Sequence, residues 1–185
     1  MHPPPPPIPL LPASLLRRHY CAKPIDTRFR AAARLRQSLW REQHGYPCGR
    51  YTPPDGRSRR LGSMVSARVG RRGVNLIDPT LIPLVQYEIA YREIGAVIHT
   101  ERLWTNLLTS QALAFNLFGP LKQHLALASA VMRRLVPDLV ADVTEVLFEH
   151  APGRGQPRFT ADHTALMCCS AAPRRRAGTP LSRSS

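Results

Sequence analysis

The 185-residue sequence lacks any apolar run long enough to cross a bilayer. Charged residues or proline interrupt every apolar stretch within about a dozen residues, whereas a spanning helix needs roughly 20. No transmembrane helix and no membrane partner are therefore expected. Cysteine is also scarce, and the four residues, at positions 21, 48, 168 and 169, fit neither a zinc template nor a disulfide framework. We interpret them as reduced thiols, which favours a cytoplasmic protein.

Lysine and acidic residues are few. The only lysines are Lys23 and Lys122, and 12 Asp and Glu stand against 26 Lys and Arg, which gives a net charge of +14. Residues 1–75 carry 15 basic and 3 acidic side chains, residues 76–150 carry 5 and 8, and residues 151–185 carry 6 and 1. The basic charge thus belongs mainly to the flanks, which favours solvated Arg-rich segments over a specific nucleic-acid site.

An apolar content of 43% over this length is enough for one domain with a core. Residues 1–29 open on a proline run and continue with Arg and Ala, so we predict a disordered Pro/Arg-rich tail. The composition of residues 13–36 also overlaps with that of organelle transit peptides, and a low-complexity extension or a misplaced start codon explains it as well. Residues 167–185 have no apolar alternation and are predicted to be a second disordered tail.

Apolar periodicity predicts four helices between the tails, over residues 30–43, from Asp78-Pro79 to about 89, over 101–108 and over 119–135. Residues 45–75 contain several Gly and Pro and an Asp55-Gly56 turn, so we predict a long loop there. The folded body is expected to begin at Asp78-Pro79. The β-branched and aromatic run Val143–Phe148 predicts a strand, and a second strand is expected to begin near Phe159.

Four acidic residues lie near the predicted strands: Asp142, Glu145, Glu149 and Asp162. Carboxylates that meet at a strand edge can hold a divalent metal through hard oxygen ligands. Solvated acids on a half-exposed strand give the same pattern, and that alternative stays open. His150 and His163 could also be ligands, but neither stands in a spacing typical of a metal site.

Two sets of polar or charged residues could contact a ligand or a partner. Asn106, Gln111 and Asn116 stand among apolar and aromatic residues, so if they are buried they must either hold a loop through hydrogen bonds or contact a ligand. The predicted 45–75 loop carries arginines that could neutralise phosphates in a small basic nucleic-acid-binding or interaction protein, namely Arg57, Arg59, Arg60, Arg68, Arg71 and Arg72.

The order of several segments is recognisable. They are RLRQSLWREQHG at 34–45, a Leu-Gly pair at 61–62, ERLWTNLLTSQALAFNLFGPL at 101–121, VMRRLVPDLV at 131–140, and VTEVLFEHAPGRG followed by PRFTADHTA within 143–165. Together they resemble a bacterial family of PD-(D/E)XK nuclease-like proteins, from about residue 34 to 166. We therefore expect residues 30–166 to be the N-terminal part of such a domain.

The resemblance implies a restriction-endonuclease-like α/β fold in which helices pack on a mixed sheet. It also implies a site with an Asp and a Glu-x-Lys on the next strand, at which DNA phosphodiesters are cut. In such a site the carboxylates hold Mg²⁺, and the lysine helps to orient or activate the attacking water. Here the expected Asp position is Met167, whose thioether cannot replace a hard oxygen ligand, and no Glu-x-Lys occurs in the sequence. Glu149 and Asp162 remain the candidate catalytic acids, and the metal is not identified.

A change of reading frame would explain Met167. Met-Cys-Cys at 167–169 can be encoded ATG-TGC-TGC, and reading one nucleotide earlier, with G in front, spells Asp-Val-Leu. The sequence thus predicts a truncated or frameshifted domain, with an incomplete sheet, that binds little Mg²⁺ and is catalytically inactive.

Overall fold

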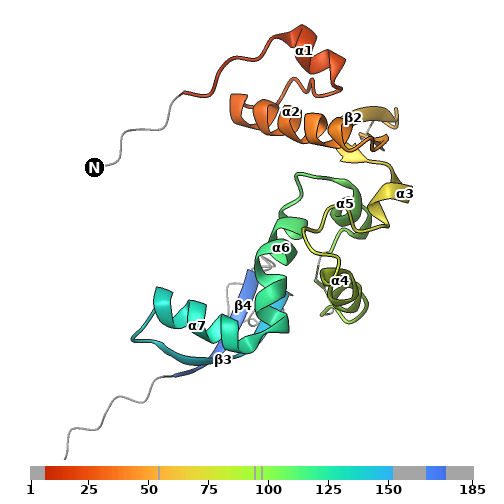
Figure 1. Ribbon diagram of the computed structural model, residues 1–185. Coiled ribbons are helices and arrows are strands. Elements are labelled where there is room, and N and C mark those ends of the chain that lie inside the picture. Colours follow the sequence, from red (N-terminus) through yellow and green to blue (C-terminus); the bar gives the residue numbers. More distant parts are fainter. Residues whose placement is uncertain (1–6, 54, 94, 97, 152–165, 174–185) are drawn as a thin grey trace, which may run out of the picture. The chain divides into compact units, whose positions relative to one another are not determined.

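The computed structural model describes residues 7–53, 55–93, 95–96 and 98–151, together with the backbone of residues 166–173. The chain divides into two compact units (Figure 1). Unit 1 comprises Met1–Ile82 and His99–Leu113, and unit 2 comprises Pro83–Ile98 and Ala114–Ser185. Helices and strands occur together, which confirms the predicted mixed α/β class.

The elements of unit 1 are α1 (Ala13–Arg18), α2 (Arg28–Gln43), β1 (Cys48–Tyr51), β2 (Arg59–Val65), α3 (Ala67–Gly70) and α5 (Thr100–Thr105). Unit 2 contains α7 (Leu125–Leu135), β3 (Val140–His150) and β4 (Leu166–Pro173). Two helices, α4 (Leu81–Ala90) and α6 (Ser110–Gln123), run from one unit into the other. No helix in the described part of the chain is long and apolar enough to cross a membrane.

Helix α2 begins where the sequence supplies a cap. The side chain of Thr27 accepts a hydrogen bond from the backbone N–H of Arg30 at 3.3 Å, which satisfies one of the free donors of the first turn. The helix ends at Gln43, as predicted, and Gly45 follows with a φ of +64°. The 1–29 segment, which we expected to be disordered throughout, contains helix α1, and the buried Cys21 connects it to the core of unit 1.

The segment 45–75 is not the irregular loop that the sequence suggested. Strands β1 and β2 pair antiparallel, with Tyr51 opposite Arg59, and α3 follows. The strand pattern was missed because β2 buries the small residues Gly62 and Ser63 next to Leu61, where an alternation of large apolar side chains would be expected. The folded body therefore begins well before Asp78-Pro79.

Small residues are needed on β2 because α2 packs closely against it (Figure 1). The N–H of Gly62 donates to the carbonyl oxygen of Tyr20 at 2.9 Å. A Cβ at position 62 would lie 2.0 Å from the carbonyl oxygen of His19 and 2.4 Å from Oγ of Ser38. The chain before α2, the helix itself and β2 therefore meet at a point where only glycine fits.

We expect Gly62→Ala to lower the free energy of unfolding by about 3 kcal/mol, because a new methyl group would press on backbone. Gly45→Ala is the matched control, since nothing lies within 4 Å of its Cβ and only the strain of a φ of +64° is added, about 1 kcal/mol. Urea unfolding followed by tryptophan fluorescence measures both variants. Equal losses would contradict the close approach at Gly62.

Four helices follow residue 78, α4 to α7, where the sequence predicted three. Asp78 accepts a hydrogen bond from the backbone N–H of Thr80 at 2.8 Å, which lowers the pKa of its carboxyl, but α4 itself begins at Leu81. α6 continues through Pro120, so the predicted helix start at Gly119 is wrong, and the break falls at His124. α7 ends at Leu135, two residues before Pro137.

In unit 2 the core lies between α7 and β3. Val143 and Val146 of β3 are buried, and α7 contributes the fully buried Ala128. The strand predicted over Val143–Phe148 is confirmed and is longer at both ends. The expected start of the next strand near Phe159 lies outside the described residues. β4 includes residues 167–173, which we expected to be disordered; their backbone instead pairs antiparallel with β3.

Candidate functional site

The β3–β4 ladder is irregular at three places, after Val140, after Val143 and after Leu147, and the third lies opposite Met167. Leu147 pairs with Cys168 and His150 pairs with Leu166. Two residues of β3, Phe148 and Glu149, therefore stand opposite the single residue Met167 of β4. Bulges of this kind bend a strand, re-aim its side chains and are common beside active sites.

Glu149 has an unusual backbone conformation within this bulge. Its φ is +53°, a region that residues other than glycine seldom occupy and that costs about 1 kcal/mol or more. Its side chain is partly exposed. Strained residues cluster at functional sites, so the conformation marks the Glu149–Met167 position as the candidate site.

The residues present do not fit a divalent metal at this position. A thioether at position 167 is a poor ligand for Mg²⁺, which prefers oxygen. Within the described ranges, no three His, Cys, Asp or Glu side chains lie close enough to hold a metal ion. Asp162, the second candidate acid, and His163 lie outside the described residues.

The other acidic residues of β3 are not gathered at the bulge. Asp142 and Glu145 are exposed, and Asp142 lies 3.8 Å from the guanidinium of Arg133. His150 contacts the carboxylate of Glu93 through Nδ1, so its imidazole is already engaged by an acid. This arrangement agrees with the alternative of solvated acids for Asp142 and Glu145.

A half-buried ion pair lies next to the bulge. Nζ of Lys122, on α6, is 2.6 Å from Oε1 of Glu88 on α4, and it lies 5.8 Å from the ring centroid of Phe148 on β3. Only 22% of the Lys122 side chain and 13% of the Glu88 side chain are exposed. The pair therefore joins two helices to the strand that carries Glu149. Sequence reasoning missed it because the two residues are far apart in the chain and each looks like an ordinary surface charge.

We expect Lys122→Met to destabilise α4 and α6 by about 3 kcal/mol, because it leaves the Glu88 carboxylate partly buried without its cation. Hydrogen–deuterium exchange of the α4 and α6 amides should accelerate by roughly 100-fold, since each 1.4 kcal/mol is a factor of ten. The matched control is Lys122→Met combined with Glu88→Leu, which removes both charges and should recover most of the protection. If the single and double variants exchange alike, the ion pair is not what holds these helices.

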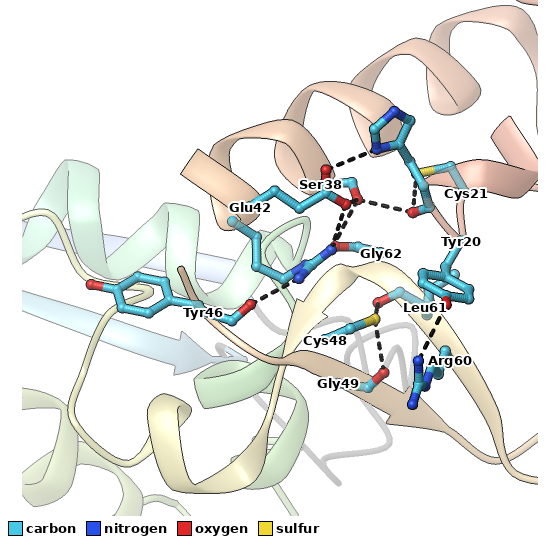
Figure 2. A network of polar contacts seen from close by, with 12 residues as sticks. Tyr20, Cys21, Ser38, Glu42, Tyr46, Cys48, Gly49, Arg60, Leu61 and Gly62 are labelled. Carbon is cyan, nitrogen blue, oxygen red and sulfur yellow. Dashed lines mark hydrogen bonds and ion pairs between the residues drawn. The ribbon is translucent and has the colours of Figure 1, made fainter. Parts of the chain in front are cut away.

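Unit 1 has a polar network that includes Ser38, Glu42, Tyr46 and Gly62 (Figure 2). The buried side chain of Arg41 contacts all four. Its Nε donates to the carbonyl oxygen of Gly62 at 2.9 Å, and its Nη1 donates to that of Tyr46 at 2.8 Å. Its Nη2 lies 2.9 Å from Oε1 of Glu42 and 3.4 Å from Oγ of Ser38. One guanidinium thus links α2 to β2 and to the turn before β1.

The same network contains a serine, a histidine and a glutamate, but not as a catalytic triad. His19 Nδ1 lies 2.8 Å from Glu42, whereas Ser38 Oγ donates to the backbone oxygen of His19 at 2.9 Å and not to its ring. Ser38 is also fully buried. A nucleophile must reach a substrate and must contact its base, so this network is structural.

The described cysteines do not have the properties of nucleophiles. Cys21 and Cys48 are free, and burial raises the pKa of both thiols above its usual value. This shift is opposite in direction to the lowered pKa that reactive cysteines have.

The candidate arginines lie in two places. Arg57, Arg59 and Arg60 belong to the β1–β2 hairpin, whereas Arg68 lies on α3 and Arg71 and Arg72 directly follow it. All six are exposed. Arg59 pairs with Asp55 at 2.5 Å, so its charge is already neutralised within the hairpin.

Two of the three polar residues set among apolar ones, Asn106 and Gln111, hold loop backbone. Oδ1 of Asn106 accepts the N–H of Leu108 at 3.0 Å, and Oε1 of Gln111 accepts the N–H of His99 at 3.2 Å. The side chain of Asn75 adds bonds to the carbonyl oxygens of Leu103 and Asn106, at 2.6 and 2.9 Å. Holding a loop, one of the two roles that the sequence allowed, is therefore what these bonds do for Asn106 and Gln111.

Comparison with known proteins gives one match. A family model described as the PD-(D/E)XK nuclease superfamily matches residues 24–169, which is most of the chain. No curated protein and no solved structure matches it. The matched region begins ten residues before the segment at 34 on which the resemblance was based, and it ends three residues after Leu166.

Proposed function

Since the chain belongs to the PD-(D/E)XK nuclease superfamily, we propose that residues 30–166 are the first part of a metal-dependent nuclease-like domain whose ancestors cut DNA phosphodiesters. We propose in addition that this 185-residue chain does not cut them. We also propose that the protein is located in the cytoplasm of a bacterium. The free thiols of Cys21 and Cys48 agree with this location.

One observation carries the proposed loss of cleavage. Met167 stands opposite the bulge at Phe148 and Glu149, at the place where the family pattern expects the metal-binding aspartate. The bulge and the strained backbone of Glu149 are features of a functional strand edge, whereas the residue opposite them cannot serve as a hard oxygen ligand. No Glu-x-Lys follows in the sequence.

We propose a shift of reading frame directly after Leu166 as the origin of this mismatch. The pairing of 166–173 with β3 supports the idea that a strand belongs here, since the backbone suits a strand although the sequence Met-Cys-Cys-Ser-Ala-Ala-Pro has no strand pattern. Sequencing the locus tests the origin. An uninterrupted frame, with no Glu-x-Lys downstream in either other frame, would exclude it.

A cleavage assay tests the function. Purified chain is incubated with supercoiled and linear DNA in Mg²⁺ or Mn²⁺, and we expect no product above the no-protein background. Glu149→Gln and Asp162→Asn should then make no difference. Robust metal-dependent cleavage that either substitution abolishes would overturn the proposal and would identify that acid as catalytic.

A further inference from the structure

Two arginines face each other across the β1–β2 hairpin. Arg50 of β1 and Arg60 of β2 are directly opposite in the antiparallel ladder, and both are exposed. Side chains in such pairs are neighbours, and like charges there destabilise a sheet. The Arg50–Arg60 pair therefore does not stabilise the folded hairpin, and folding alone does not explain its presence.

Neutral groups hold these two side chains in place without cancelling their charge. Nε of Arg50 donates to Oγ of Ser58 at 2.9 Å, and Nη2 donates to the carbonyl oxygen of Ser58 at 3.0 Å. Nη1 of Arg60 donates to the hydroxyl of Tyr20 at 3.2 Å (Figure 2). The guanidinium of Arg60 also lies 5.5 Å from the ring centroid of Tyr20. Both cations are oriented and remain available to an anion.

A further cation lies near the hairpin but on the other face of β1 from Arg50, because adjacent residues of a strand point to opposite faces. Nζ of Lys23 lies 4.4 Å from the ring centroid of Tyr51, which follows Arg50 on β1. Arg57, in the turn between the strands, is exposed. The acid of this turn, Asp55, is already paired with Arg59. We name Arg50, Arg57 and Arg60 the hairpin cations.

The charge around the hairpin has the same sign. Residues 13–65 contain twelve Lys and Arg but only three acids. Each acid is paired with an arginine, Asp26 with Arg34, Glu42 with Arg41 and Asp55 with Arg59. Nine cations of this segment thus have no acidic partner in the described part of the chain, which favours a polyanionic partner over a mixed-charge protein surface.

We propose that the β1–β2 hairpin binds the phosphate backbone of a nucleic acid through the hairpin cations. Eleven of the twelve basic residues of the segment are arginine, whose planar guanidinium matches the oxygens of a phosphate. The phosphates would relieve the repulsion between Arg50 and Arg60. Binding needs no metal and no cleavage, so it is independent of the function proposed above.

The experiment compares the full chain with Arg50→Gln combined with Arg60→Gln. Fluorescence anisotropy with a labelled 20-nucleotide single strand and the matching duplex gives the affinities between about 50 and 200 mM salt. We expect the variant to bind at least tenfold more weakly. The plot of log K against log salt for the duplex should become less steep by roughly 1.8, about 0.9 for each lost phosphate contact. The melting temperature should stay unchanged or rise, because the like-charge pair is gone.

The matched control is Arg92→Gln combined with Arg134→Gln, which makes the same change of net charge on exposed arginines of unit 2. It should keep the wild-type affinity. Arg57→Gln, within the turn, provides a second variant that leaves the ladder intact and should weaken binding about threefold or more. Equal losses in the hairpin and control variants would overturn the proposal. So would binding to phosphatidylserine vesicles with no binding to either nucleic acid.

Discussion

Arg41→Met is expected to unfold most of unit 1, with a loss of about 4 kcal/mol or more in the free energy of unfolding. Arg41 is only 5% exposed and donates hydrogen bonds to two backbone oxygens, those of Gly62 and Tyr46. Each of these acceptors would be left in the interior without its donor, at about 1–3 kcal/mol each. Glu42 would lose its cation as well. Small domains have only about 5–15 kcal/mol in total.

Tryptophan fluorescence is a specific measurement for this variant, because both tryptophans, Trp40 and Trp104, belong to unit 1. Urea titration should show a much lower midpoint for Arg41→Met. Arg36→Met is the matched control, since Arg36 is exposed on the same helix and its loss should cost less than about 0.5 kcal/mol. Arg41→Lys keeps the charge but not the planar guanidinium, so its urea midpoint should lie between those of the other two variants. Similar midpoints for the Arg41 and Arg36 variants would show that the network does not hold the unit together.

The sequence predicted helices α2, α4, α5 and α7, with shifted ends, but it did not predict α1, α3, most of α6 or the hairpin. Helix α2 has a cap at Thr27 and a glycine after its last turn, and both signals are local. Strand β2 is defined by its partner instead. Gly62 is small because α2 lies against it, and that constraint is visible only in three dimensions.

The candidate site divides in the same way. The expectation of an aspartate at position 167 came from the order of motifs along the chain, because a family pattern is linear. The bulge that faces it was not predicted, since a bulge is a property of two strands in register. The Lys122–Glu88 pair joins α6 to α4, and no spacing of residues along the sequence predicts it. A motif within one segment could be recognised from the sequence. A bulge or an ion pair that two segments form together could not.

Moving the reading frame back by one nucleotide after the Leu166 codon is expected to convert an inactive chain into a nuclease. If the frame has shifted as proposed, the edited gene encodes Asp-Val-Leu in place of Met167, Cys168 and Cys169, and a Glu-x-Lys on the next strand. The carboxylates would supply the hard oxygen ligands that the present chain lacks, and the added strands would complete the sheet. Metal-dependent DNA cleavage should then rise from background by a factor of roughly 1,000 or more, since bound metal contributes several kcal/mol to such reactions.

Two comparisons make this result specific. Changing the restored aspartate to asparagine in the edited protein should return cleavage to background while leaving the melting temperature within a few degrees, because the side chains have the same shape. The edited protein should also melt higher than the present chain, since β4 would gain a paired neighbour in place of a free edge. An edited gene that yields a stable protein without cleavage, or a downstream frame without Glu-x-Lys, would show that position 167 marks an older divergence of this chain and not a recent shift of frame.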